Sequence, residues 1–293
     1  MPERLENRHA ELVTAVVDWF GEHARDLPWR RPEAGPWGVL VSEFMLQQTP
    51  VSRVLEPWAQ WLQRWPSPAT LAADPPGEAV RMWGRLGYPR RALRLHAAAV
   101  AIVERHDGQI PADHDALLAL PGVGAYTAAA VSAFAFGGDE VVLDTNVRRV
   151  LARAVGGVEF QANSPTAAER RLAAEVWPPE GAARWSAAAM ELGALVCTAA
   201  TPRCVDCPIL ADCAWVTAGR PPHSGPPRRG QAYAGTDRQV RGRLLEVLRA
   251  SEEPVAAARL DLVWDDPVQR DRALASLLTD GLVVRRGKEY ALP

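Results

Sequence analysis

The stretch Leu120–Ala128, LPGVGAYTA, lies between two segments, 113–119 and 125–134, whose composition predicts helices. Gly122 and Gly124 stand two residues apart, which permits a tight hairpin whose backbone N–H groups point outward. The second glycine also opens the following helix, and a helix N-terminus favours an anion. The stretch therefore predicts a phosphate-binding site that does not depend on base sequence. An ordinary packing turn between two helices is the structural alternative.

Helical patterns extend to both sides of this hairpin. From Leu12 to about Trp215, apolar residues recur at three- and four-residue spacing, and proline and glycine separate the runs. No long alternating strand pattern occurs in this region. We therefore expect an all-α core over residues 1–216.

A smaller region follows the core. Residues 217–236 are rich in proline, glycine and arginine, and we expect a basic linker there. Residues 237–293 contain two helical runs, 238–249 and 267–278, with a shorter one between them. The chain then ends in two short strand patterns about a turn at Arg286-Gly287-Lys288. Three helices and a hairpin resemble a winged-helix module.

The charge is small overall but unevenly distributed. The formal net charge is −2, which argues against a wholly basic nucleic-acid binder. Residues 81–105, however, carry six arginines against Glu104, and residues 220–243 carry six against Asp237. Solvated helix faces would explain either segment alone. The two together predict one positive face that follows phosphates.

All four cysteines lie close together, at Cys197, Cys204, Cys207 and Cys213. A chain with no secretory features rarely uses disulfides, so this cluster indicates a metal site. Zinc is the alternative, but structural zinc sites usually have two short knuckles, and only one occurs here. The wider steps suit thiolates at the corners of one 4Fe–4S cluster, with the loop 197–213 around it. We expect a structural role, in which the loop presents Arg203 to DNA.

Two carboxylates stand out near these motifs. Glu43 lies within the apolar helical run Gly38–Thr49, GVLVSEFMLQQT, and burial there would raise its proton affinity. Asp144 follows the β-branched run of VLDTNVRRV and precedes a helix, so N-capping is its simplest role. An exposed helical position is the corresponding simple reading of Glu43.

The segments SEFMLQQT, LPGVGAYTA and VLDTNVRRVLAR and the C-x6-C-x2-C-x5-C spacing occur in this order. Together they resemble the adenine DNA glycosylase (MutY-type) branch of the endonuclease III superfamily, over about residues 10–216. The resemblance implies a helix-hairpin-helix fold in which two helical subdomains flank a DNA-binding cleft. It also implies an enzyme of base excision repair that hydrolyses the N-glycosidic bond of adenine opposite 8-oxoguanine or guanine.

The resemblance assigns roles to named residues. It implies that Glu43 protonates a ring nitrogen of the extruded adenine and that Asp144 stabilises the positively charged sugar, through a transient covalent adduct. This matches the two-carboxylate logic of glycoside cleavage, and extrusion exposes the bond to the enzyme. Tyr126 would position the aspartate and the sugar. The other implied contacts are a base pocket of Trp29, Arg30 and Glu191, a wedge of Gln48, Thr49 and Leu86, the inserted aromatic Tyr88, and DNA contacts from Gly122, Gly124 and Arg203.

The lysine content predicts the type of glycosylase. Sister enzymes carry a lysine in the hairpin motif and cleave the backbone through a Schiff base. The matching residue here is Tyr126, and Lys288 is the only lysine of the chain. An amine nucleophile therefore has no candidate in the core, and we expect a monofunctional glycosylase without efficient lyase activity.

The resemblance stops before the C-terminal region. Family members usually have a Nudix-like domain that recognises 8-oxoguanine, and residues 237–293 are too short for it. Pro89 also stands where many members have a second aromatic residue. Strict discrimination of 8-oxoguanine from guanine therefore does not follow from the resemblance. We expect the module and linker to add duplex contacts; a folding cap, or a docking site for a repair protein, is the alternative.

Three other functions fit parts of the sequence. A glycosylase-lyase acting on oxidised pyrimidines is opposed by the missing lysine and by the QQT segment. An iron–sulfur DNA-binding regulator without catalysis would use the terminal module, and a zinc-stabilised nucleic-acid binder would use the cysteines alone. The N-terminus lacks a signal-peptide pattern, and no apolar run approaches 18 residues. We expect a cytoplasmic monomer that binds mispaired double-stranded DNA and no membrane.

Overall fold

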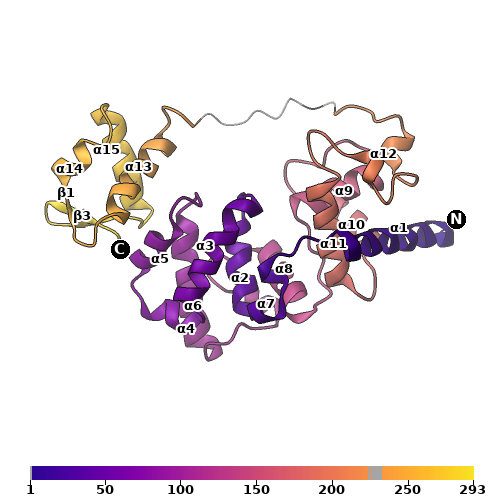
Figure 1. Cartoon of the computed structure of the whole chain (residues 1–293), viewed down its shortest axis with the longest axis horizontal. Coiled ribbons are helices and arrows are strands. Elements are labelled where there is room, and N and C mark those ends of the chain that lie inside the picture. The colour runs from indigo at the N-terminus through magenta and orange to yellow at the C-terminus, as the bar shows by residue number, and fades with distance from the viewer. Residues whose placement is uncertain (1, 224, 226–232) are drawn as a thin grey trace. The chain divides into compact units, whose positions relative to one another are not determined.

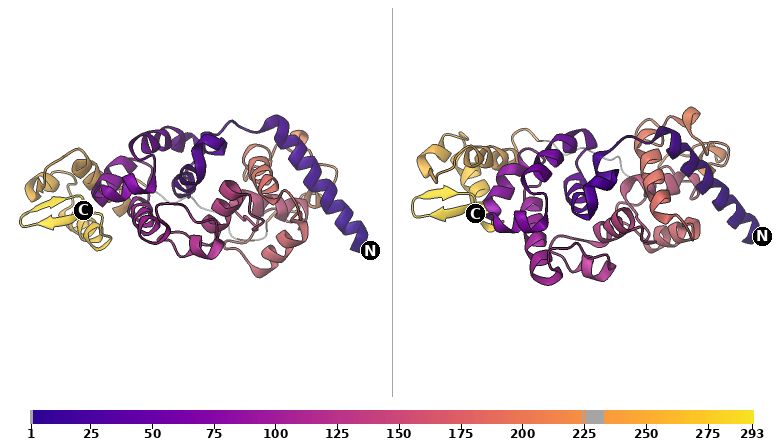
Figure 2. Two further views of the ribbon diagram at one scale, coloured as in Figure 1. Left: turned by 90° about the horizontal axis from the view of Figure 1, so that it is seen from below. Right: turned by 60° about the horizontal axis from the view of Figure 1, so that its bottom comes forward.

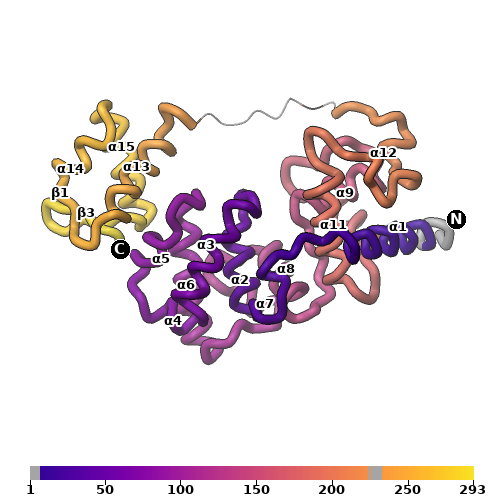
Figure 3. The backbone as a smooth tube through the Cα atoms, in the orientation of Figure 1, coloured from indigo at the N-terminus to yellow at the C-terminus, as the bar shows by residue number. Residues whose placement is uncertain are grey.

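The computed structural model describes residues 2–223, 225 and 233–293, with side chains from residue 7 onward (Figures 1 and 3). The predicted all-α core is confirmed. Part of the expected linker, residues 224 and 226–232, lies outside the described residues. No helix that is described has the length and apolar character needed to cross a membrane. The chain divides into two compact units, each built from separate stretches of sequence.

Unit 1 comprises Met1–Val39, Ala112–Leu118 and Gly124–Pro226. Its core joins helices from both ends of this set and includes Leu12, Val150, Trp185 and Leu192, each at most 4% exposed. The helices are α1 (Pro2–His23), α7 (His114–Leu118), α8 (Ala125–Phe136), α9 (Thr145–Ala154), α10 (Ala167–Val176), α11 (Ala182–Leu195) and α12 (Ala214–Thr217), with 3-10 turns η1 (Pro28–Arg30), η2 (Pro32–Ala34) and η3 (Cys204–Asp206).

Local signals explain where several of these helices begin. The α9 helix begins after Asp144, whose side chain accepts a hydrogen bond from the Val147 N–H. The α10 helix begins with a capping box between Thr166 and Glu169. Because Gly124 precedes α8 in an extended conformation, the hairpin leads directly into that helix.

Unit 2 comprises Leu40–Pro111, Ala119–Val123 and Pro227–Pro293. In its first part, Trp61 packs edge-on against Trp65 and Trp83, with ring centroids 4.6 and 5.6 Å away. This cluster packs the helix that carries Trp61 against the helix that carries Trp83. This part contains the helices α3 (Val51–Arg64), α4 (Pro68–Ala73), α5 (Pro76–Trp83) and α6 (Arg90–His106). It also contains α2 (Gly35–Leu46) from Leu40 onward.

The C-terminal module completes unit 2. It contains helices α13 (Asp237–Arg249), α14 (Ala257–Asp261) and α15 (Pro267–Thr279) and strands β1 (Val255–Ala256), β2 (Val284–Arg286) and β3 (Glu289–Ala291). The predicted helices and the terminal hairpin are confirmed, and Figure 2 shows β2 and β3 as antiparallel arrows. Strand β1 was not predicted from the sequence; it adds to β3 in a three-stranded sheet of order β1-β3-β2.

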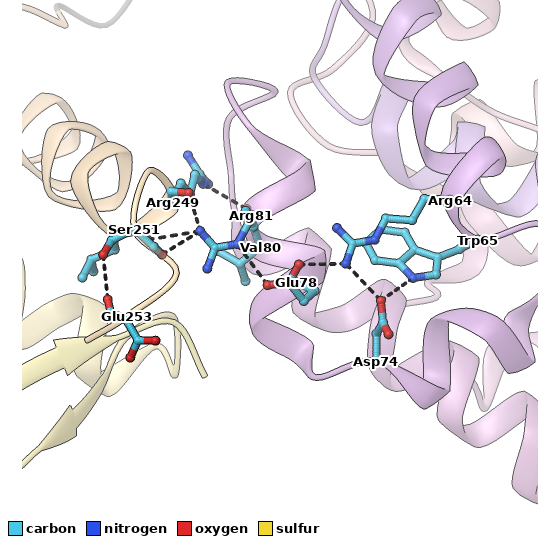
Figure 4. Close-up of polar contacts among 10 residues, drawn as sticks. Arg64, Trp65, Asp74, Glu78, Val80, Arg81, Arg249, Ser251 and Glu253 are labelled. Carbon is cyan, nitrogen blue, oxygen red and sulfur yellow. Dashed lines mark hydrogen bonds and ion pairs between the residues drawn. The ribbon is translucent and has the colours of Figure 1, made fainter. Parts of the chain in front are cut away.

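Main-chain contacts fix this module to α5 (Figure 4). Arg81 donates to the carbonyls of Arg249 and Ser251, the latter at 2.9 Å, and Arg249 donates back to the carbonyl of Val80 at 2.9 Å. The Gly77 N–H donates to the carbonyl of Pro293 at 2.7 Å. Module and helices therefore form one packed body.

Candidate active site

Asp144 lies at the start of α9 in unit 1 and is partly buried. One carboxylate oxygen accepts from the Val147 N–H at 2.6 Å, and the other accepts from Asn146 Nδ2 at 2.7 Å. Burial raises the pKa of Asp144 above its usual value, while these hydrogen bonds and the charge of Arg149 act in the opposite direction. The expected N-cap is thus observed, and Asn146 holds the second oxygen.

Two buried arginines of α9 connect Asp144 to the cysteine loop. Arg149 donates to Asn146 Oδ1 and to the carbonyls of Gly193 and Cys197, each at 2.7 Å. Arg153 donates to the carbonyl of Thr198 at 2.7 Å and to Cys197 Sγ at 3.4 Å. Because Asp144 caps the helix that carries both arginines, these hydrogen bonds fix the position of the cysteine loop relative to Asp144.

The four cysteines line one pocket, together with Arg153 and Trp215. Burial raises the pKa of the Cys207 thiol to about 11, and the other thiols add to the rise. A bound metal would reverse this effect, because it favours the thiolate. Among the described residues, no three cysteine, histidine or acidic side chains are placed to share a single ion. The four thiols line one pocket, which fits a cubane cluster that would bind one thiolate at each iron.

Arg203, the predicted DNA contact of this loop, lies between the first two cysteines. Its guanidinium donates twice to the carbonyl of Leu195, at 2.6 and 3.1 Å, and so caps the C-terminus of α11. The side chain stays 59% exposed. Its observed role is structural, and contact with DNA remains a prediction.

An ion-pair network around the buried Glu191 contains two of the three predicted base-pocket residues. Glu191 on α11 is 1% exposed; Arg30 donates to it at 2.8 Å, and Arg25 donates with Nε, Nη2 and its backbone N–H. Burial alone would raise the pKa of Glu191, but these hydrogen bonds outweigh it and lower the pKa to about 2. Trp29, the third residue, is buried in η1. Arg25 was not predicted from the sequence as a partner of Glu191.

Glycine occupies the two hairpin positions for different structural reasons. Gly122 has φ +80°, and a Cβ atom there would lie 2.6 Å from the Cβ of Arg94. Gly124 has nothing within 4 Å of such an atom and is exposed, so space for an approaching group is its distinctive feature. Tyr126, two residues later on α8, is partly buried and packs against an alanine cluster that includes Ala129 and Ala130.

Glu43 lies inside α2, and its residue is only 4% exposed. Its helix neighbours Leu40, Phe44 and Met45 are fully buried. The exposed-helix reading is therefore wrong, and Glu43 is buried on a helix whose neighbouring residues are apolar. Glu43 belongs to unit 2 and Asp144 to unit 1.

Arg91 on α6 holds together the two loops that carry the predicted wedge. It is 5% exposed and donates to the carbonyls of Gln47 and Gly87, at 2.6 and 3.1 Å, and to Thr49 Oγ1 at 3.1 Å. Burial lowers its pKa to about 10. From the sequence, Arg91 was predicted only as part of a basic segment, and this role was not foreseen.

The wedge residues and the predicted inserted aromatic, Tyr88, differ in exposure. Gln48 and Tyr88 are exposed and have positive φ values of 53° and 45°, which are unusual for residues other than glycine. Thr49 and Leu86 are buried at 7% and 4% exposure, and Thr49 donates to the Leu86 carbonyl at 3.4 Å. Strain concentrates at functional positions in many proteins, so Gln48 and Tyr88 are the stronger candidates for DNA contact.

Comparisons with known proteins agree with this arrangement. Residues 41–179 match the sequence model of the HhH-GPD superfamily base excision DNA repair protein. An adenine DNA glycosylase of Mycobacterium tuberculosis is 54% identical over 284 residues, which cover 96% of this chain and 93% of that protein. One of Mycolicibacterium smegmatis is 55% identical over 271 residues, with coverages of 92% and 91%. A solved thermostable thymine-DNA glycosylase has a TM-score of 0.66 at 26% identity, over 72% of this chain and 98% of that one. The chain is therefore a DNA glycosylase of base excision repair and belongs to the adenine DNA glycosylase family.

Proposed function

We propose that this chain releases adenine mispaired with 8-oxoguanine or guanine in duplex DNA. The observation that carries the proposal is the 54% identity, across 96% of the chain, to a protein named adenine DNA glycosylase. The products are free adenine and an abasic site, with water completing the cleaved bond.

Glu43 is the proposed general acid. Its burial among apolar residues of α2 supports this role, because a low-dielectric setting favours the protonated carboxyl group that an acid catalyst needs. The proton goes to a ring nitrogen of the adenine, which makes the base a better leaving group.

Asp144 is the proposed stabiliser of the positive charge that develops on the sugar. Its two oxygens are held by the Val147 N–H and by Asn146, so the carboxylate is preorganised and no reorientation is required during the reaction. Tyr126 on α8 is the proposed positioning residue. Trp29, Arg30 and Glu191 form the proposed base pocket, in which the ion pair with Glu191 would orient Arg30.

One 4Fe–4S cluster is the proposed cofactor, held by Cys197, Cys204, Cys207 and Cys213. When bound, it would supply iron–thiolate bonds that cross-link the loop. Arg149 and Arg153 would then connect the stiffened loop to the helix that begins at Asp144.

The proposed enzyme is monofunctional, and it acts as a monomer in the cytoplasm. Lys288, the only lysine, lies in the turn between β2 and β3 of the C-terminal module. A Schiff base would require a lysine beside the sugar. Borohydride treatment should therefore trap no covalent enzyme–DNA complex.

The test is base release measured as alkali-induced strand cleavage under single-turnover conditions. Duplexes would carry adenine opposite 8-oxoguanine, guanine or thymine, with thymine opposite guanine as a further arm. We expect cleavage at the first two and none at the others. Release of thymine, or of no base at all, would contradict the proposed substrate.

Two isosteric variants test the catalytic roles. We expect Glu43→Gln and Asp144→Asn each to lower the rate of base release by at least ~10³-fold, within the range typical of acid catalysis and charge stabilisation. Asparagine retains the N-cap, so folding should persist. Duplex affinity should stay within a few-fold. Glu104→Gln, an exposed change on α6, is the matched control, and full activity in either catalytic variant would exclude the assigned role.

A further inference from the structure

A large groove lies between the α5–α6 loop, residues 84–89, and the α13 helix of the C-terminal module. Its volume is about 1460 Å³, and all residues that line it belong to unit 2. Sites for small molecules are typically about 300–1,000 Å³. The groove is therefore large for a single metabolite and wide enough for an extended ligand.

The lining is strongly positive. Ten of the lining residues are arginine, and the only acidic ones are Glu246 and Asp280. These arginines come mainly from the two basic segments of the sequence, 81–105 and 220–243. The prediction that both segments build one positive face is confirmed for these residues, and the charge favours a polyanion.

Several of the groove arginines are engaged in holding the module. Arg85 pairs with Glu246 at 2.5 Å, and Asp280 accepts from both Arg90, at 3.1 Å, and Arg241, at 2.5 Å. These pairs neutralise both acidic residues of the lining.

Four exposed arginines of the lining have no acidic partner within the described residues, although Arg53 also donates to the carbonyl of Arg85. Within the described residues, no carboxylate lies at ion-pair distance from Arg53 on α3, Arg94 on α6, or Arg238 and Arg243 on α13. Arg238 stacks over the Tyr88 ring with 5.1 Å to its centroid, and Arg243 stacks over Trp264 at the same distance. The module therefore places Arg238 directly beside the exposed, strained Tyr88.

Two other elements of the module, α15 and the β2–β3 hairpin, also carry basic residues. A winged-helix protein would be expected to use its later helix, here α15, to contact DNA. Both arginines of α15 form ion pairs inside the module, Arg270 with Asp261 at 2.9 Å and Arg272 with Asp237 at 2.7 Å. The β2–β3 hairpin carries exposed Arg285, Arg286 and Lys288 and is the remaining rival.

We propose that α13, rather than α15 or the β2–β3 hairpin, is the DNA-contacting element of the module. Arg238 and Arg243 bind phosphates of the same duplex that Arg53 and Arg94 contact from the helical part of unit 2. The module thus supplies one wall of a phosphate-binding groove. This inference rests on the proposed function only for the identity of the ligand, duplex DNA.

The test compares Arg238→Ala/Arg243→Ala with Arg285→Ala/Arg286→Ala/Lys288→Ala in the full-length holoenzyme. Fluorescence anisotropy with a mispaired duplex of about 25 base pairs, over a series of salt concentrations, gives both the affinity and its salt dependence. The triple variant removes more charge than the double one, so it controls for long-range electrostatics. Arg238→Lys/Arg243→Lys keeps the charge and serves as the rescue.

We expect the double alanine variant to bind about tenfold more weakly and to lower the slope of log K against log salt by about 1.8, since each phosphate contact contributes about 0.9. The lysine pair should restore most of the slope, and the triple variant should stay within twofold of wild type. Wild-type affinity and slope in the double alanine variant, or an equal loss in the triple variant, would overturn the inference. Base release measured on the same samples separates the two proposals: a wild-type enzyme that binds duplex but frees no adenine refutes the function alone.

Discussion

The surroundings of Asp144 in unit 1 and the wedge loops of unit 2 are both fixed by buried arginines that donate to main-chain carbonyls. In unit 1, Arg149 and Arg153 lie on α9 itself and reach the cysteine loop. In unit 2, Arg91 reaches across from α6 to two loops and contacts no cofactor loop. The geometry at Asp144 should thus depend on the cluster, and that at Gln48 and Tyr88 should not.

The largest expected effect comes from breaking the unit 2 arrangement. Arg91→Met should lower the free energy of unfolding by about 4 kcal/mol, because several buried carbonyls lose their donor. Base release should fall as the loops lose their register, while the iron content stays at the wild-type level. Urea unfolding and iron analysis measure both. Arg105→Met, exposed at the end of the same helix, should change stability by less than about 0.5 kcal/mol.

The corresponding change in unit 1 is Arg153→Met. We expect a loss of about 3 kcal/mol and a preparation depleted in iron and sulfide, since this arginine supports Cys197, Thr198 and Ala199. Iron content and the visible absorbance of the cluster are the measurements. A fully loaded Arg153→Met protein, or an iron-poor Arg91→Met protein, would remove the contrast between the units.

The ion pair of Glu191 in unit 1 can be tested through the pH dependence of the free energy of unfolding. Its carboxyl pKa is lowered from 4.5 to about 2, so its stabilising contribution is complete above about pH 4.5 and is lost as the pH falls towards 2. Glu191→Gln should cost about 2–3 kcal/mol at pH 7. The difference from wild type in urea unfolding should shrink steadily between pH 4.5 and 2.5. A difference that is independent of pH would show that packing, not charge, explains the loss.

The smallest expected effect tests the hairpin. Gly122→Ala places a Cβ atom against Arg94 at positive φ and should cost about 2 kcal/mol. Gly124→Ala meets no atom within 4 Å and should leave stability within about 0.5 kcal/mol, while duplex affinity falls. Thermal unfolding and anisotropy separate the two. Equal destabilisation by both changes would contradict the distinct roles of the two glycines.

The sequence predicted those features that have a local cause. The hairpin glycines, the Asp144 cap and the elements of the C-terminal module, except β1, follow from turn, capping and periodicity rules. Strand β1 has only two residues and exists because it pairs with β3, so no pattern announces it. The apolar neighbours of Glu43 predicted its setting, and its burial is observed.

The buried arginines were not predictable in the same way. Arg91, Arg149 and Arg153 occur in helical stretches where arginine is normally solvated. Their burial depends on carbonyls brought near by distant segments, such as Cys197 for Arg149 and Gln47 for Arg91. Tertiary structure alone supplies that information.

The order of segments in unit 2 has a consequence for biosynthesis. Helix α5 is made well before α13, with the whole of α6–α12 between them. At about 5–20 residues per second, the surface around Arg81 waits several seconds or more for its partner. Closing so long a loop also carries an entropic cost that slows folding. Nascent chains of this protein should therefore expose an incomplete unit 2 on the ribosome, whereas most of unit 1 can pack as soon as α11 emerges.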